Sequence, residues 1–153
     1  MDKIFSKSTQ TANFDIILGH SQGAILLAAL LSLHEKLWNA RSGPPGYILN
    51  GCAWPNPYCR SLMSISARKE IGMVDMLPQI AFIMGKEDNI NPVESAMKVH
   101  DAFVPGFDVS IVNHGGGHSV PIGDDEDSKR ALQEIADWII LNAKRIQLTK
   151  LPK

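Results

Sequence analysis

The sequence has little cysteine, no excess of charge of one sign, and no hydrophobic run long enough to cross a bilayer. Two cysteines in 153 residues are too few for a disulfide framework and fit a protein with reduced thiols. Fifteen basic residues against sixteen acidic ones give a net charge of −1, which provides no electrostatic basis for binding nucleic acid or an anionic membrane. The longest apolar run covers residues 24–31, and no signal-peptide pattern opens the chain. We therefore expect a cytoplasmic protein without nucleic-acid or membrane partners.

The composition is that of an ordinary globular protein. Hydrophobic residues make up 44% and charged residues 20% of the chain, and no repeat, low-complexity segment or linker divides it. This length can bury a sizeable core, so we expect a single domain over residues 1–153. Residues 1–13 are polar and irregular, and we expect them to be a poorly ordered or helical lead-in.

Short apolar segments alternate with helical patterns along the chain. The expected strands cover residues 14–18, 47–51, 79–84 and 108–112. The alternation favours an α/β fold in which a parallel sheet of about four strands has flanking helices. Functional groups in such sheets gather at the carboxyl ends of the strands. Ser21, Asp88, His114 and His118 all follow expected strands, which predicts that they lie at one edge of the sheet.

Three helices are expected between and after these strands, over residues 22–38, 93–103 and 128–144. The second has a start signal with Asn91 as N-cap, Pro92 at the first helical position and Glu94 three residues after the cap. Helical spacing in the last one predicts a single apolar face made of Ala131, Leu132, Ile135, Ala136, Ile139 and Ile140. The acidic run 124–127 precedes that helix, where its negative charges interact favourably with the positive, N-terminal end of the helix dipole.

The pentapeptide Gly19-His20-Ser21-Gln22-Gly23 places a serine between two glycines, after a strand pattern and before a helix pattern. In a nucleophile elbow the serine sits in a strained turn, and the glycines let strand and helix approach without Cβ clashes. On this interpretation Ser21 is a nucleophile, and the backbone N–H of Gln22 is one oxyanion donor. The alternative is a plain glycine-rich turn.

A serine nucleophile needs a base and an acid, and two later segments offer them. Asp88 and Glu87 are the competing acids, although aspartate in such a position also stabilises turns. His118 follows a run of three glycines and is the candidate base, whereas His114 fits a strand-end histidine satisfied by hydrogen bonds. The spacing of the two histidines also suits zinc on a helix, but the glycines make a helix there unfavourable. We therefore expect no metal.

Two further side chains are candidates for substrate binding. His20 lies inside the pentapeptide, although a histidine there is more often a packing or surface residue. Trp54, in the proline-rich loop 52–59, either lines an acyl pocket or covers the core. Cys52 and Cys59 of the same loop lack the spacing of a redox or zinc pair.

Three segments of the sequence resemble motifs of the family of serine hydrolases (FSH), a small-esterase branch of the α/β-hydrolases. Residues 14–24 are similar to its FDxxxGFSQGA elbow, with His20 where phenylalanine is usual. Residues 85–92 are similar to its G-x-x-D-x-x-x-P acid segment, and residues 114–121 to its H-P-G-G-H-x-V-P histidine segment, with Gly115 in place of proline. The resemblance covers about residues 14–142.

The resemblance implies a catalytic triad of Ser21, Asp88 and His118, in the chain order of α/β-hydrolases. It implies a serine hydrolase of the carboxylesterase or thioesterase type that acts on small acyl esters or thioesters and uses no cofactor. It also selects Asp88 over Glu87 as the acid.

The family has several strands before its nucleophile strand, and the first of them ends in a His-Gly segment that contributes to the oxyanion hole. Nothing before Phe14 matches that part, so the resemblance implies the carboxyl-terminal half of such a domain, lacking the usual N-terminal strands. Strand 14–18 would then be a sheet edge, completed by a missing N-terminal half or by a homodimer partner. The alternative function is an inactive hydrolase remnant that associates through this edge.

Overall fold

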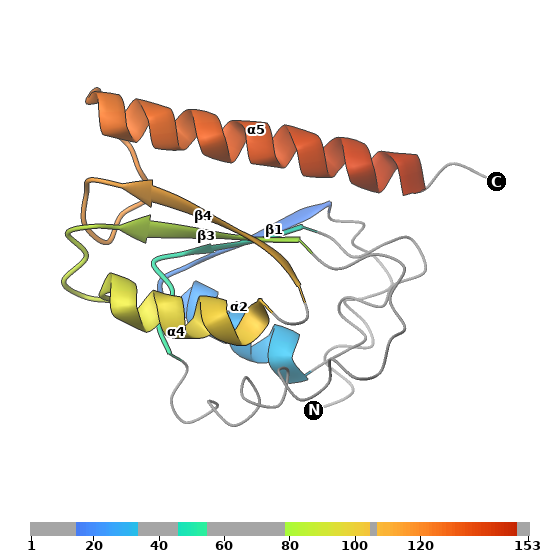
Figure 1. Ribbon diagram of the computed structural model, residues 1–153, viewed down its shortest axis with the longest axis horizontal. Coiled ribbons are helices and arrows are strands. Elements are labelled where there is room, and N and C mark those ends of the chain that lie inside the picture. The colour runs from blue at the N-terminus through green and yellow to red at the C-terminus, as the bar shows by residue number, and fades with distance from the viewer. Residues whose placement is uncertain (1–14, 34–45, 55–78, 105–106, 150–153) are drawn as a thin grey trace.

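The computed structural model describes residues 15–33, 46–54, 79–104 and 107–149. Four parallel strands form one sheet in the order β1-β2-β3-β4 (Figure 1). The strands are β1 Ile16–His20, β2 Gly46–Asn50, β3 Gln79–Gly85 and β4 Asp108–His114. The predicted α/β fold with a parallel sheet is therefore confirmed. The expected lead-in at residues 1–13 lies outside the described residues.

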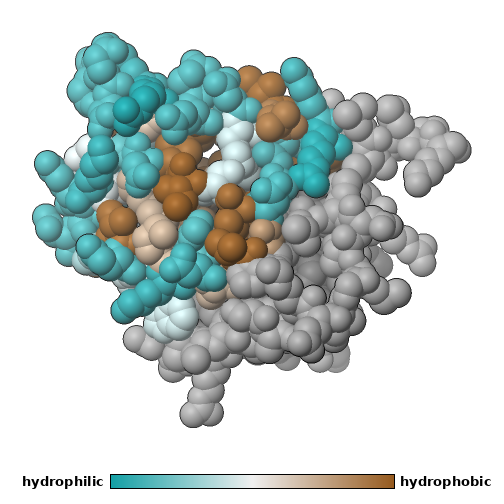
Figure 2. Space-filling view, viewed as in Figure 1, coloured by the Kyte–Doolittle hydropathy of each residue, from teal (hydrophilic) through white to brown (hydrophobic). Residues whose placement is uncertain are grey.

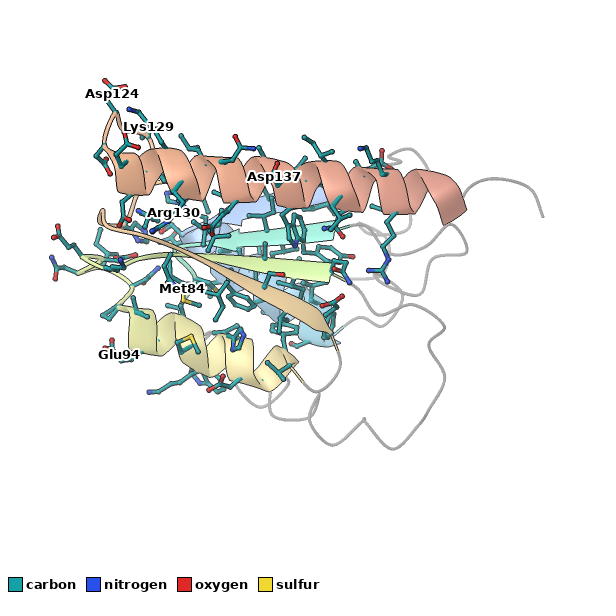
Figure 3. All side chains as sticks on the ribbon, turned by 45° about the horizontal axis from the view of Figure 1, so that its top comes forward. Met84, Glu94, Asp124, Lys129, Arg130 and Asp137 are labelled. Atoms are coloured by element: carbon teal, nitrogen blue, oxygen red, sulfur yellow. The ribbon has the colours of Figure 1, made fainter. Side chains whose placement is uncertain are left out.

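Helices cover both faces of this sheet. Helices α2 (Gln22–Leu33) and α4 (Val93–Phe103) lie on one face, and α5 (Glu126–Thr149) lies on the other (Figure 1). Two buried clusters fill the layers, because successive residues of each strand point to opposite faces. Leu49 belongs to the α2 and α4 side and Ile48 to the α5 side. Met84 lies between the sheet and α4 (Figure 3). Among the described residues, no helix is both long and apolar enough to cross a bilayer.

The strand predictions are correct in number but place several ends too early. β1 continues to His20, which pairs with Asn50, and β4 continues to His114, which pairs with Gly85. Polar histidines interrupt the apolar pattern at both ends, whereas the ladder continues because the neighbouring strand supplies the backbone partners. The predicted end of the first helix, at residue 38, falls outside the described residues.

The predicted cap of α4 is wrong. The N-cap is Pro92, with no side-chain hydrogen bond, and the helix begins at Val93. The Asn91 side chain instead donates through Nδ2 to the carbonyl of Gly51, at 2.6 Å. Asn91 is therefore engaged with the turn after β2, and its amide is not available to cap the helix.

The predicted apolar face of the last helix is also wrong in part. Of the six predicted residues Ala131 is buried and Ile135 is partly buried, but Leu132, Ile139 and Ile140 are 38%, 36% and 51% exposed and Ala136 is also exposed. Trp138 packs against the sheet in their place, over Gly46, where a Cβ would come 3.0 Å from the indole ring. Apolar residues occupy both flanks of α5, so helical spacing alone could not select the flank that faces the sheet.

β1 and β4 are the outer strands of the sheet. Figure 2 shows apolar side chains at the surface between α5 and α4, along the β4 edge. On the β1 edge, Leu18 is 53% exposed. It shares a strand face with Ile16, two residues earlier, which packs into the α5-side cluster. An exposed apolar surface thus runs from β1 toward α5.

The orientation of α5 can be tested by two alanine substitutions on the same helix. We expect Trp138→Ala to lower the free energy of unfolding by about 3 kcal/mol, because it empties the space over Gly46. We expect Ile140→Ala to change it by less than about 0.5 kcal/mol, as for other exposed positions. Urea denaturation of both variants measures the difference. Equal losses, or a larger loss for Ile140→Ala, would contradict this orientation of α5.

Candidate active site

Ser21 sits in a sharp turn between β1 and α2, with a positive φ of 54°. Its backbone N–H donates to the carbonyl of Asn50 at 2.9 Å, and its own carbonyl accepts from the N–H of Ile25 at 3.1 Å. A Cβ on Gly19 would come 2.7 Å from the carbonyl oxygen of Gly23, so this position has no room for a side chain. Gly23 differs, because a Cβ there would meet nothing within 4 Å. Only the first glycine of the motif is required by close packing.

The side chains of Ser21, His118 and Asp88 form one hydrogen-bonded chain. His118 Nε2 lies 2.7 Å from Ser21 Oγ, and His118 Nδ1 lies 2.7 Å from Asp88 Oδ2. The serine and histidine are 97 positions apart in the sequence, and the histidine and aspartate 30. The sheet brings them together because β1, β3 and β4 are parallel and end at the same edge.

The carboxylate of Asp88 is buried and held by backbone donors. Its Oδ1 accepts from the N–H of Ile90 at 2.9 Å and from the N–H of Asn91 at 2.8 Å. Burial alone would raise the pKa of Asp88, but the hydrogen bonds from Asn91, His118 and Ile90 together lower it below its usual value. Asp88 is therefore negatively charged at neutral pH. Glu87, the competing acid, is exposed, and its backbone N–H donates to the carbonyl of Gly116.

Backbone segments pack closely against His118 and its loop on two sides. A Cβ on Gly85 would overlap the carbonyl oxygen of Gly117, so the end of β3 and the glycine run pack backbone to backbone. The N–H groups of Lys86 and Glu87 donate to the carbonyls of His114 and Gly116, at 2.9 and 3.1 Å. On the other side lies Gly51, with a φ of +57°, where a Cβ would come 3.0 Å from Cε1 of His118.

The backbone N–H of Gln22 is the predicted oxyanion donor. Gln22 is the first residue of α2 and is exposed. Amides in the first turn of a helix have no intrahelical acceptor, and the helix dipole there favours negative charge. Gln22 can therefore donate to a negatively charged oxygen formed beside Ser21.

The two candidate substrate-binding side chains have different surroundings. His20 is exposed, and its ring centre lies 5.3 Å from that of His118. Trp54 packs against the core on the α2 and α4 side, and its backbone N–H donates to Ser95 Oγ at 3.2 Å. This favours the alternative in which Trp54 covers the core. Cys59 lies outside the described residues.

His114 is buried at the end of β4, and its Nε2 has no hydrogen-bond partner among the described residues. The expectation that hydrogen bonds satisfy its ring is therefore not met at that atom. Burial lowers the pKa of His114 against the opposing effect of nearby aspartates, of which Asp88 contributes most, so the ring is neutral. No group of three potential metal ligands occurs in the part of the chain that the structure describes.

A family model described as "Serine hydrolase (FSH1)" matches residues 1–129. The chain belongs to this serine hydrolase family. Comparison with curated proteins gives no match.

Solved structures with a similar fold are longer than this chain. A variant of SOBER1 from Arabidopsis thaliana has 19% identity and a TM-score of 0.59 over 92% of this chain and 60% of SOBER1. A Bacillus cereus carboxylesterase has 16% identity and a TM-score of 0.52 over 92% of this chain and 56% of the esterase. At these identities the likeness concerns the fold alone. The chain spans less than two thirds of the length of either protein.

The close packing of Gly51 against His118 predicts different effects for two glycine-to-alanine substitutions near Ser21. We expect Gly51→Ala to slow the labelling of Ser21 by a fluorophosphonate probe about 100-fold, because the added Cβ displaces the imidazole. Gly23→Ala is the matched control and should label at close to the wild-type rate, since its Cβ meets no atom. Similar labelling rates for the two variants would mean that Gly51 does not determine the position of His118.

Proposed function

We propose that this chain carries the nucleophile, base and acid of a serine hydrolase that cleaves small acyl esters or thioesters. The observation that carries the proposal is the hydrogen-bonded chain from Ser21 Oγ through His118 to Asp88, with 2.7 Å at each step. Membership of the serine hydrolase family supports the same chemistry. The negatively charged carboxylate of Asp88 accepts a hydrogen bond from Nδ1 of His118. This favours the tautomer in which Nε2 of His118 carries no proton and can accept the proton of Ser21.

The reaction has two halves. Ser21 Oγ attacks the acyl carbon while His118 Nε2 takes the hydroxyl proton, and the negative charge moves to the acyl oxygen. His118 then gives the proton to the leaving alkoxide or thiolate, and an acyl-serine remains. A water molecule, deprotonated by His118, attacks the acyl carbon and releases a carboxylate and Ser21. Asp88 stabilises the imidazolium at each stage.

The backbone N–H of Gln22 binds the oxyanion in both halves. Loss of one oxyanion donor costs about 10²–10³ in rate in other serine hydrolases. If Gln22, the one donor identified among the described residues, acts alone, hydrolysis is expected to be slower by this factor than with two donors.

Fluorophosphonate labelling tests the assignment of the nucleophile and base. We expect the wild-type chain to label, and Ser21→Ala and His118→Ala to lose labelling, because one removes the attacking oxygen and the other the base. Ser119→Ala is the matched control, an exposed serine beside His118, and should label normally. Labelling that persists in Ser21→Ala, or that disappears in Ser119→Ala, would place the nucleophile elsewhere.

A second candidate function, association through the β1 edge, is supported by the exposed apolar surface there. In the described part of the chain β1 pairs only with β2, and Leu18 on β1 and Ile139 on α5 are exposed. An outer strand with apolar neighbours is a template for pairing with another chain. We propose a second copy of this chain as the partner, since an edge can pair with itself about a two-fold axis. The alternative partner is a separate segment that pairs with β1 in place of a second copy.

Light scattering of the purified chain tests this association. We expect a dimer, and we expect Leu18→Lys to shift it toward the monomer, because a charged residue on an edge strand opposes pairing. Ile111→Lys is the matched control on the opposite edge strand and should remain dimeric. A wild-type chain that is monomeric at high concentration would exclude the second copy and favour the separate segment.

A further inference from the structure

The side chain of Asn91 binds a backbone group outside the proposed triad. Asn91 lies between Asp88 and the start of α4, and its Nδ2 donates to the carbonyl oxygen of Gly51 at 2.6 Å. A backbone carbonyl can only accept a hydrogen bond, so the nitrogen of the Asn91 amide must be the atom that faces it. The two residues are 40 positions apart, and their hydrogen bond joins the turn after β3 to the turn after β2.

Gly51 connects this hydrogen bond to the imidazole of His118. A Cβ on Gly51 would come 3.0 Å from Cε1 and 3.1 Å from Nδ1 of His118, so the backbone of Gly51 packs directly against the ring. The N–H of Gly51 donates to the carbonyl of Ile83 in β3 at 3.0 Å, and its own carbonyl accepts from Asn91. The backbone that supports the imidazole is therefore held at both of its polar groups, and Asn91 holds one of them.

Asn91 also contacts the acid of the triad. Its backbone N–H donates to Asp88 Oδ1 at 2.8 Å, and Asp88 Oδ2 lies 2.7 Å from Nδ1 of His118. The ring of His118 is thus contacted by Asp88 at Nδ1 and by Gly51 beside Cε1, and Asn91 is bound to both of these residues. Contacts at two atoms of the ring restrict its rotation more than the hydrogen bond to Asp88 alone.

We propose that Asn91 is a positioning residue for His118, whose side chain acts through Gly51 to keep the imidazole within reach of Ser21. The proposal rests on the hydrolase function proposed above. His118 Nε2 lies 2.7 Å from Ser21 Oγ, a distance that suits proton transfer, and a displacement of about 1 Å can slow such a reaction about 100-fold. Asn91 touches no reacting atom in this role.

Nuclear magnetic resonance tests this geometry without a substrate. In the wild-type chain we expect a strong nuclear Overhauser effect between an α-proton of Gly51 and the Cε1 proton of His118, because the two groups are in contact. Asn91→Ala removes the side-chain amide but keeps the backbone N–H that donates to Asp88, and it should weaken this effect. Asn89→Ala is the matched control, an exposed asparagine in the same turn, and should leave the effect unchanged. An effect of full strength in Asn91→Ala would overturn the proposal, whether or not the chain hydrolyses an ester.

A double-mutant cycle tests whether Asn91 acts through Gly51. We expect Asn91→Ala to slow the fluorophosphonate labelling of Ser21 about tenfold, and Asn89→Ala to leave the rate unchanged. Gly51→Ala itself displaces the imidazole, so adding Asn91→Ala to it should slow labelling by less than about twofold more. A further tenfold loss in the Gly51→Ala background would mean that Asn91 acts by another route, and would overturn the proposal. A wild-type chain that does not label would instead count against the hydrolase function, and the Overhauser effect would still decide the role of Asn91.

Discussion

The left-handed backbone of Ser21 is the constraint on which the rest of the site depends. A non-glycine residue at this φ costs on the order of 1–2 kcal/mol, so its surroundings must hold it there. They do so from both sides: Asn50 accepts the N–H of Ser21, Ile25 donates to its carbonyl, and Gly19 lets the first turn of α2 approach the strand. The position of the hydroxyl is therefore fixed by the β1–β2 ladder and by α2, before the acid or the base contributes.

Asn91 links Asp88 to the backbone that supports His118. Its backbone N–H donates to Asp88, and its side chain donates to the carbonyl of Gly51, against which His118 packs. One residue thus joins the turn after β3 to the turn after β2. The loop of His118 is held separately by hydrogen bonds to the N–H groups that follow β3. These hydrogen bonds support the imidazole from several strands, which suits the role of proton acceptor proposed for His118.

The sequence indicates the parts of the site that depend on local pattern. Gly19 and Ser21 lie between a strand pattern and a helix pattern, and the glycines before His118 mark a loop after the last strand, so their meeting at one edge follows from a parallel sheet. Contacts between distant segments could not be predicted in this way. Asn91 looked like a helix cap because its target, Gly51, is 40 positions away. Trp138 was missed because the space that it fills exists only where α5 crosses Gly46.

The strand that leads into Ser21, the proposed nucleophile, is an outer strand of the sheet, and this places the two proposed functions side by side. On the side of β2, Asn50 binds the backbone of Ser21, and Gly51 supports His118. That side of the serine is therefore occupied by His118 and the backbone that supports it. The opposite side of β1 has no strand beside it among the described residues. A chain that pairs with β1 would cover this open side, so the proposed association would take place directly beside the proposed nucleophile.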